Sequence, residues 1–85
     1  MTISNLKDKI ELIFPNLVSF QLDRVDNITE ILIELDGEIE YHQLVRLSLL
    51  AETLDIRLNS IYKYDGEGTC LYNIIELKTS KVFEQ

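Results

Sequence analysis

The spacing of apolar residues switches from a helical period to strand alternation twice along this chain, which limits the folds it can adopt. Between residues 3 and 14 apolar residues recur at intervals of three and four, and this pattern predicts a helix with one apolar face. Thr2 or Ser4 can cap its start, and Pro15 disfavours helical geometry at the residue before it. Residues 18–35 then alternate in two runs around a turn at 24–27, which is typical of a hairpin of half-buried strands.

The same order returns in the second half. A helix is predicted at 40–54, followed by a strand at 56–64, a turn at 65–68 and a strand at 71–78. The alternation of the third strand slips near residues 59 and 60, which indicates a bulge. The sequence therefore predicts an α+β fold in αββαββ order, with a four-stranded, mostly antiparallel sheet and both helices packed on one face.

The length of 85 residues corresponds to one domain, which we expect to span 1–78, with a C-terminal tail at 79–85. Its two halves also share short matches. Residues 31–35 resemble 73–77 at a spacing of 42, and residues 18–20 resemble 56–58 at a spacing of 38. Internal duplication and chance similarity both account for such short matches, and the predicted architecture depends on neither.

Acidic residues outnumber basic ones by 15 to 8, giving a net charge of −7, and most of the excess lies between residues 23 and 40. That window contains Arg24 and seven acids: Asp23, Asp26, Glu30, Glu34, Asp36, Glu38 and Glu40. Direct binding to nucleic acid or to an anionic membrane requires clustered Lys and Arg, so we expect neither. A basic protein surface is the natural electrostatic complement.

The residue types that support catalysis or metal binding are scarce. His42 and Cys70 are the only histidine and cysteine, whereas a zinc site needs three or four ligands. We expect Cys70 to be a packing residue, and we predict no enzyme activity, no metal and no cofactor.

A single cysteine excludes an internal disulfide, no apolar run exceeds three residues, and charges interrupt the first twenty residues. These features predict a cytoplasmic protein that does not enter a membrane.

Strand alternation predicts a second sheet face that the helices do not cover. In the first hairpin it would present Ser19, Gln21, Asp23, Glu30, Leu32 and Glu34, and in the second Arg57, Asn59, Ile61, Lys63, Tyr72, Ile74, Glu76 and Lys78. An apolar patch on such a face often marks an interface. The alternative is that the alternation is misassigned and that the apolar residues Leu32, Ile61, Tyr72 and Ile74 belong to the core.

A separate apolar strip lies on the second helix at Tyr41, Val45 and Leu49. Two helices packed side by side on a sheet touch each other, so we expect this strip to face the first helix. The alternative is a contact with another subunit or partner.

These observations favour a protein-binding module, such as an inhibitor or adaptor, that docks on a basic surface; a nucleic-acid-handling protein is one candidate partner. An alternative is a homodimeric or accessory structural subunit, and a third is a small enzyme with an intersubunit site. The predicted partner-binding residues are Asp23, Asp26, Glu30, Leu32, Glu34, Asp36, Glu38, Glu40, Ile61, Tyr72 and Ile74.

Overall fold

The computed structural model describes residues 1–65 and 71–84. Its elements are α1 (Ile3–Ile13), β1 (Leu17–Val25), β2 (Ile28–Asp36), α2 (Tyr41–Thr53), β3 (Arg57–Asp65) and β4 (Leu71–Thr79). The predicted αββαββ order is therefore confirmed. The predicted turn at 65–68 falls largely outside the described residues, and so does the predicted packing role of Cys70.

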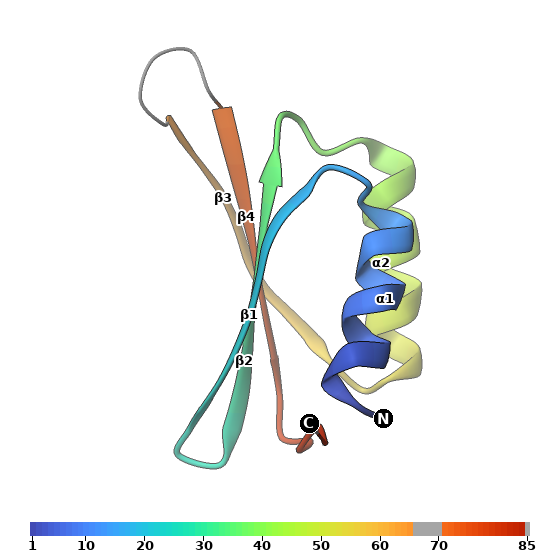
Figure 1. Cartoon of the computed structure of the whole chain (residues 1–85), viewed down its shortest axis with the longest axis vertical. Helices are drawn as coiled ribbons and strands as arrows, with labels where there is room; N and C mark the ends of the chain where they lie inside the picture. The colour runs from blue at the N-terminus through green and yellow to red at the C-terminus, as the bar shows by residue number, and fades with distance from the viewer. Residues whose placement is uncertain (66–70, 85) are drawn as a thin grey trace.

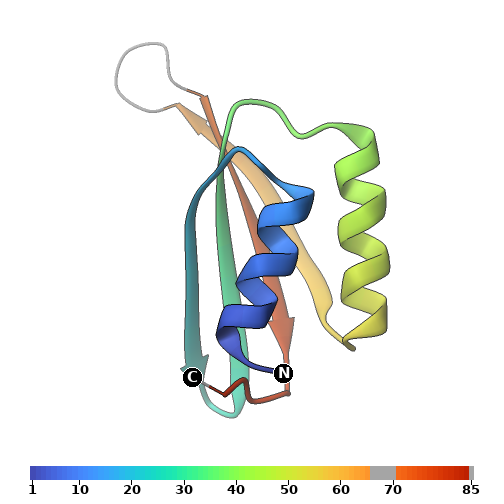
Figure 2. The same cartoon turned by 45° about the vertical axis from the view of Figure 1, so that its right-hand side comes forward.

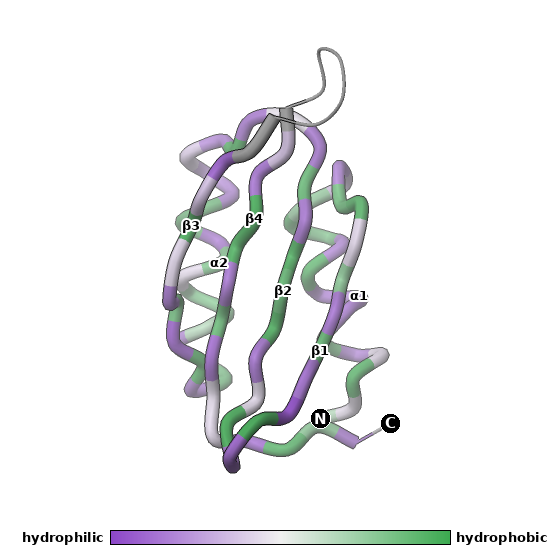
Figure 3. Tube along the Cα trace, turned by 90° about the vertical axis from the view of Figure 1, so that its left-hand side faces the viewer, coloured by the Kyte–Doolittle hydropathy of each residue, from purple (hydrophilic) through white to green (hydrophobic). Residues whose placement is uncertain are grey.

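The four strands form one antiparallel sheet in the order β1-β2-β4-β3. Both helices lie on the same side of this sheet and run in opposite directions (Figure 1, Figure 2). The predicted α+β architecture, with its helices on one face, is confirmed. Figure 3 looks onto the other face, with α1 and α2 behind the sheet.

Local sequence features explain where α1 begins and ends and how β1 turns into β2. The Thr2 hydroxyl accepts a hydrogen bond from the Asn5 amide at 3.1 Å and caps α1, and Pro15 follows closely on its end. The hairpin between β1 and β2 turns on Asp26 and Asn27, whose φ angles are 51° and 68°. Positive φ at both turn residues gives the twist that a two-residue hairpin requires, and Asp and Asn tolerate it.

The core lies between the helices and the inner face of the two central strands. Odd-numbered residues of β2 and β4 point into it, which gives these strands a strict alternation of burial. The fully buried apolar side chains are Leu6, Ile10, Phe14, Ile31, Ile33, Leu35, Leu47, Ile75 and Leu77. Gln43 joins the two helices, because its Nε2 donates to the Ile13 carbonyl at 3.2 Å while its Oε1 accepts from the Glu40 amide.

Residues 80–84, within the predicted tail, pack against the domain. Phe83 belongs to the hydrophobic core with 8% of its surface exposed. The Lys81 carbonyl accepts hydrogen bonds from the Thr29 hydroxyl at 2.6 Å and from Arg24 Nη1 at 3.1 Å. Glu84 pairs with Thr2 beside the start of α1. This segment therefore connects the end of β4 to the first hairpin and to α1.

Strand pairing relates the two halves of the sheet by an internal two-fold symmetry. Residues that are 42 positions apart, the predicted spacing, take equivalent places on β2 and β4, and the equivalent residues Ile33 and Ile75 lie directly opposite each other. The edge strands β1 and β3 are related in the same way. Each contains one bulged residue, Val18 in β1 and Asn59 in β3, and these two residues are 41 positions apart. The predicted spacing of 38 for these strands is wrong, because it paired the bulged Val18 with Ile56, which precedes β3.

Candidate functional site: the open face of the sheet

Strand register defines which side chains share the open face, because directly opposed residues of an antiparallel pair point to the same side. From β1 to β3, three rows cross this face: Asp23–Glu30–Lys78–Arg57, Gln21–Leu32–Glu76–Ser60 and Ser19–Glu34–Ile74–Tyr62. Asp36 and Tyr72 are opposed at the start of a fourth row. The face therefore combines apolar side chains at its centre with charged ones around them.

An apolar ridge, formed by Leu32, Ile74 and Tyr62, crosses the middle of the face. Ile74 lies directly opposite Tyr62, and Leu32 lies diagonally across from Ile74 on the two central strands. Such neighbours are close enough for side-chain contact. Tyr62 is 46% exposed, whereas Leu32 and Ile74 are half-buried. The ridge is therefore an accessible apolar surface on a face that no other part of the described chain covers.

Two carboxylates flank this ridge on opposite sides, because Glu34 and Glu76 occupy the other diagonal of the two central strands. The Glu76 Oε2 atom accepts a hydrogen bond from the Ser60 hydroxyl at 3.2 Å. The internal two-fold relation exchanges Glu34 with Glu76 and Leu32 with Ile74. The centre of the face consequently presents a similar pattern to a partner in two opposite orientations.

The first row breaks this symmetry because its acidic and basic residues are separated. Asp23 and Glu30 oppose each other on β1 and β2, and Lys78 and Arg57 oppose each other on β4 and β3. Lys78 Nζ lies 3.9 Å from Glu30 Oε1 and 3.7 Å from Glu76 Oε1, so it forms a loose ion pair with each carboxylate. Like charges placed directly opposite each other destabilise a sheet. Glu30 and Lys78, which are opposed on the central strands, offset part of this repulsion, and the acidic and basic ends of the row stay separate.

A hollow of 450 Å³ lies beside the acidic pair and is lined by Gln21, Leu22, Asp23, Glu30 and Leu32. The Asp23 Oδ1 atom accepts a hydrogen bond from the Arg24 amide at 2.8 Å, which fixes that carboxylate. Leu32 gives the hollow an apolar wall, and two carboxylates stand at its rim. This combination suits the long apolar stem and charged end of a lysine or arginine.

The structure brings together seven of the eleven predicted partner-binding residues on the open face: Asp23, Glu30, Leu32, Glu34, Asp36, Tyr72 and Ile74. The other four lie elsewhere. Asp26 is in the hairpin turn, and Glu38 and Glu40 are in the connection to α2. The acidic window is therefore not a single patch, since β2 carries it from one end of the domain to the other.

The predicted placement of Ile61 and Lys63 on the open face is wrong. The bulge at Asn59 shifts the register by one residue, so Ile61 opposes the buried Ile75 and Lys63 opposes the buried Asn73. Ser60 and Tyr62 take their places on the open face. The slip in alternation near residues 59 and 60 marked the bulge, and it was the only sequence signal for these two residues.

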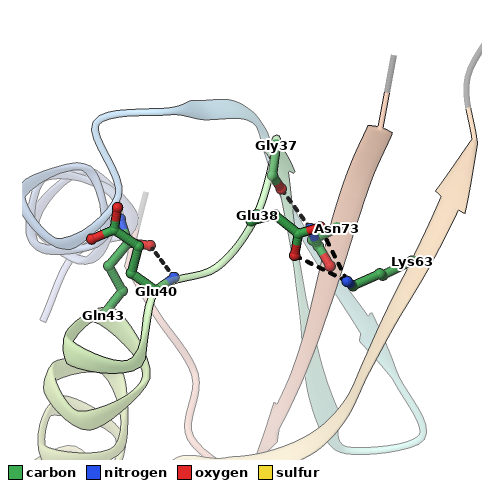
Figure 4. Close-up of polar contacts among 6 residues, drawn as sticks. All are labelled: Gly37, Glu38, Glu40, Gln43, Lys63 and Asn73. Atoms are coloured by element: carbon green, nitrogen blue, oxygen red, sulfur yellow. Dashed lines mark hydrogen bonds and ion pairs between the residues drawn. The ribbon is translucent and has the colours of Figure 1, made fainter. Parts of the chain in front are cut away.

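Glu38 and Glu40 have structural partners at the entry to α2 (Figure 4). Lys63 Nζ lies 2.9 Å from Glu38 Oε2, and the Asn73 side-chain amide donates to the Gly37 carbonyl, so both contacts hold this connection against the sheet. Gly37 has a φ of +82°, a conformation that favours glycine. The Glu38 carboxylate therefore has a partner within the domain, and Glu40 Oε2 lies 3.1 Å from His42 Nδ1.

The strip at Tyr41, Val45 and Leu49 does not face α1, so that prediction is wrong. Tyr41 is 82% exposed, Leu49 is 60% exposed, and Val45 is also exposed. The buried residues of α2 include Gln43 and Leu47, and each strip residue precedes a buried residue by two positions. Because two residues correspond to about 200° around a helix, the strip points away from the core.

Within residues 1–65 and 71–84, no group of three or more His, Cys, Asp and Glu side chains is arranged to hold a metal ion. Across the same residues, no helix is long and apolar enough to cross a membrane. Comparison of the chain with protein-family models, curated proteins and solved structures finds no match in any of the three.

Proposed function

We propose that this protein is a protein-binding module, an inhibitor or adaptor, that docks a basic surface of its partner on the open face of its sheet. The observation that carries the proposal is the apolar ridge of Leu32, Ile74 and Tyr62 with Glu34 and Glu76 on its two sides. Exposed apolar patches bordered by charged residues are typical of interaction sites. The charge of the chain, −7, adds long-range attraction for a basic partner.

The rest of the molecule supports a binding role better than a catalytic one. The open face is shallow, and a catalytic carboxylate pair works in a cleft that excludes water. Nucleic-acid-handling proteins are one candidate class of partner, because their basic surfaces match these acids. We also propose that the protein acts in the cytoplasm, since its single cysteine provides no internal disulfide.

The proposal predicts that partner capture depends on where charge is removed. Changing Glu34 and Glu76 to Gln should reduce capture of proteins from a host lysate, mainly by slowing their association, and should weaken its dependence on salt. Gln keeps a carbonyl acceptor for Ser60. The measurement is quantitative capture on immobilised protein at low and high salt.

The matched control changes Asp8 and Glu84 to Asn and Gln, which removes the same charge away from the face. Asp8 is exposed on α1, and Glu84 holds its place through backbone bonds to Met1 and Ile3. Equal capture by both double variants, with the same set of captured proteins, would contradict the proposal.

A second candidate function, a homodimeric or accessory structural subunit, is favoured by the strip of Tyr41, Val45 and Leu49. Such spacing gives a helix an apolar line that packs well against another helix. Leu49 is more exposed than a side chain that contributes to the core of its own domain. Figure 1 shows α2 on the side of the sheet away from the open face, so a dimer through α2 leaves the open face free.

If the protein pairs through this strip, Leu49→Glu should convert a dimer of about 20 kDa into a monomer of 9.9 kDa. A charge placed in an apolar helix contact is costly because its hydration is lost. Sedimentation at micromolar concentration measures the mass, and Leu12→Glu on α1, another exposed leucine, is the control. A wild-type protein that sediments as a monomer throughout this range would rule out the homodimer and leave only a contact of this strip with a different protein.

A further inference from the structure

The open face has a geometry that selects the kind of partner it can dock. Both central strands are hydrogen-bonded on each side, β2 to β1 and β4, and β4 to β2 and β3. A partner lying on this face therefore gains no backbone hydrogen bonds from it, unlike a strand added at a sheet edge. The docked segment must satisfy its own backbone groups, which a helix does internally.

The face is also wide enough to hold a helix. Four strands about 4.8 Å apart span about 14 Å between the outer strands, and a helix with its side chains is about 10 Å across. The apolar ridge runs diagonally over the two central strands and reaches Tyr62 on β3. A helix aligned with this ridge places one apolar stripe on it and turns its two flanks toward Glu34 and Glu76.

Charge decides between a foreign partner and a second copy of this chain. The charged side chains of the open face are five acids and two bases, so each face carries a net charge of −3: Asp23, Glu30, Glu34, Asp36 and Glu76 against Arg57 and Lys78. Two copies packed face to face would enclose twice this excess of negative charge, and removing carboxylates from water without matching cations is unfavourable. A partner with Lys or Arg on both sides of an apolar stripe balances the excess instead.

We propose that the open face binds a basic amphipathic helix of a partner protein, whose apolar stripe lies on Leu32, Ile74 and Tyr62. This inference rests on the proposed binding function and specifies the partner. One basic side chain of that helix enters the hollow between Asp23 and Glu30, with its stem against Leu32. The end of the helix over Lys78 and Arg57 carries an acidic residue, which gives the complex a single direction.

A synthetic probe tests the inference without knowledge of the natural partner. The probe is a peptide of about five helical turns, with one leucine stripe, lysines along both of its flanks and glutamine elsewhere. A second peptide has the same composition in an order that forms no stripe, and a third has glutamates in place of the lysines. Binding is followed by fluorescence anisotropy, and the contact surface by amide shifts in nuclear magnetic resonance spectra.

The striped basic peptide should bind with shifts concentrated in the strands β1 to β4. The permuted and acidic peptides should bind at least about ten-fold more weakly, because they lose the stripe or the attraction. Ile74→Lys should weaken binding about ten-fold, since it places a charge in the ridge. Asp23→Asn combined with Glu30→Gln should weaken it about five-fold, as expected for two exposed ion pairs.

The control variant combines Asp8→Asn with Glu52→Gln, two exposed acids on the helices, and should bind as the wild type does. Equal binding of the permuted peptide, or shifts centred on α2, would overturn the inference. If the striped peptide fails to bind while partner capture still depends on Glu34 and Glu76, the specified partner class is wrong and the binding function stands. If capture is also indifferent to Glu34 and Glu76, the binding function fails as well.

Discussion

Ile33→Ala is expected to lower the free energy of unfolding by about 2–5 kcal/mol, the cost of emptying a buried site of this size. Ile33 is completely buried and lies at the centre of the sheet, directly opposite the equally buried Ile75. The stability of a small domain is only about 5–15 kcal/mol. A loss of this size should therefore appear as a large shift of the urea or thermal unfolding midpoint.

Leu32→Ala, one residue earlier on the same strand, is the control. Leu32 points to the open face and is only half-buried, so its truncation should cost at most about 1 kcal/mol. A larger loss for Leu32→Ala than for Ile33→Ala would show that the inner and outer faces of β2 have been reversed. That result would also remove the basis for the apolar ridge.

The elements were predictable from the sequence because the periodicity and its interruptions agree. β2 alternates between fully buried residues such as Ile31 and half-exposed residues such as Glu30, and this contrast appears directly in the sequence. The helix period before Pro15 is equally regular. Central strands and amphipathic helices therefore have a sequence signature, because one side of each is buried and the other is not.

The face of β3 was not predictable because an edge strand has little contrast in burial. Ile61 points toward the helices and Tyr62 away from them, yet they are 40% and 46% exposed. Apolar residues on both sides satisfy either register, and a bulge at Asn59 decides between them. The sequence revealed that the alternation slips at this point. Which residues of β3 then face the helices depends on how the strand pairs with β4.

The extent of the acidic site was overestimated for a different reason. Residues that are close in sequence separate in space when a strand joins them, and the nine residues of β2 extend about 27 Å. Asp26 lies at one end of this strand and Glu38 beyond the other. Glu76, in contrast, joins the open face from β4, far away in sequence. Which residues are neighbours on a sheet depends on strand pairing, and counting charges along the sequence gives no information about that pairing.

Phe83→Ala is expected to lower the free energy of unfolding by about 3 kcal/mol, which is the lower end of the range for truncating a buried phenylalanine. From the sequence, this residue belongs to a predicted tail, and removing it would then have no effect. In the structure its side chain is part of the core, and the backbone before it is tied to the first hairpin. The unfolding free energy from urea denaturation is the measurement.

Val82→Ala gives the matched comparison, because Val82 is the preceding residue and is 71% exposed. Its truncation should change stability by no more than about 0.5 kcal/mol. In a disordered tail both side chains are hydrated before and after unfolding, so neither truncation would change the free energy of unfolding. A larger loss for Phe83→Ala than for Val82→Ala therefore requires that the segment holds a fixed position. Thr29→Val should add an intermediate loss of about 1 kcal/mol, because it removes the hydroxyl that donates to the Lys81 carbonyl. If all three variants unfold as the wild type does, residues 80–84 contribute nothing to the domain, and its stability comes from α1, α2 and the sheet alone.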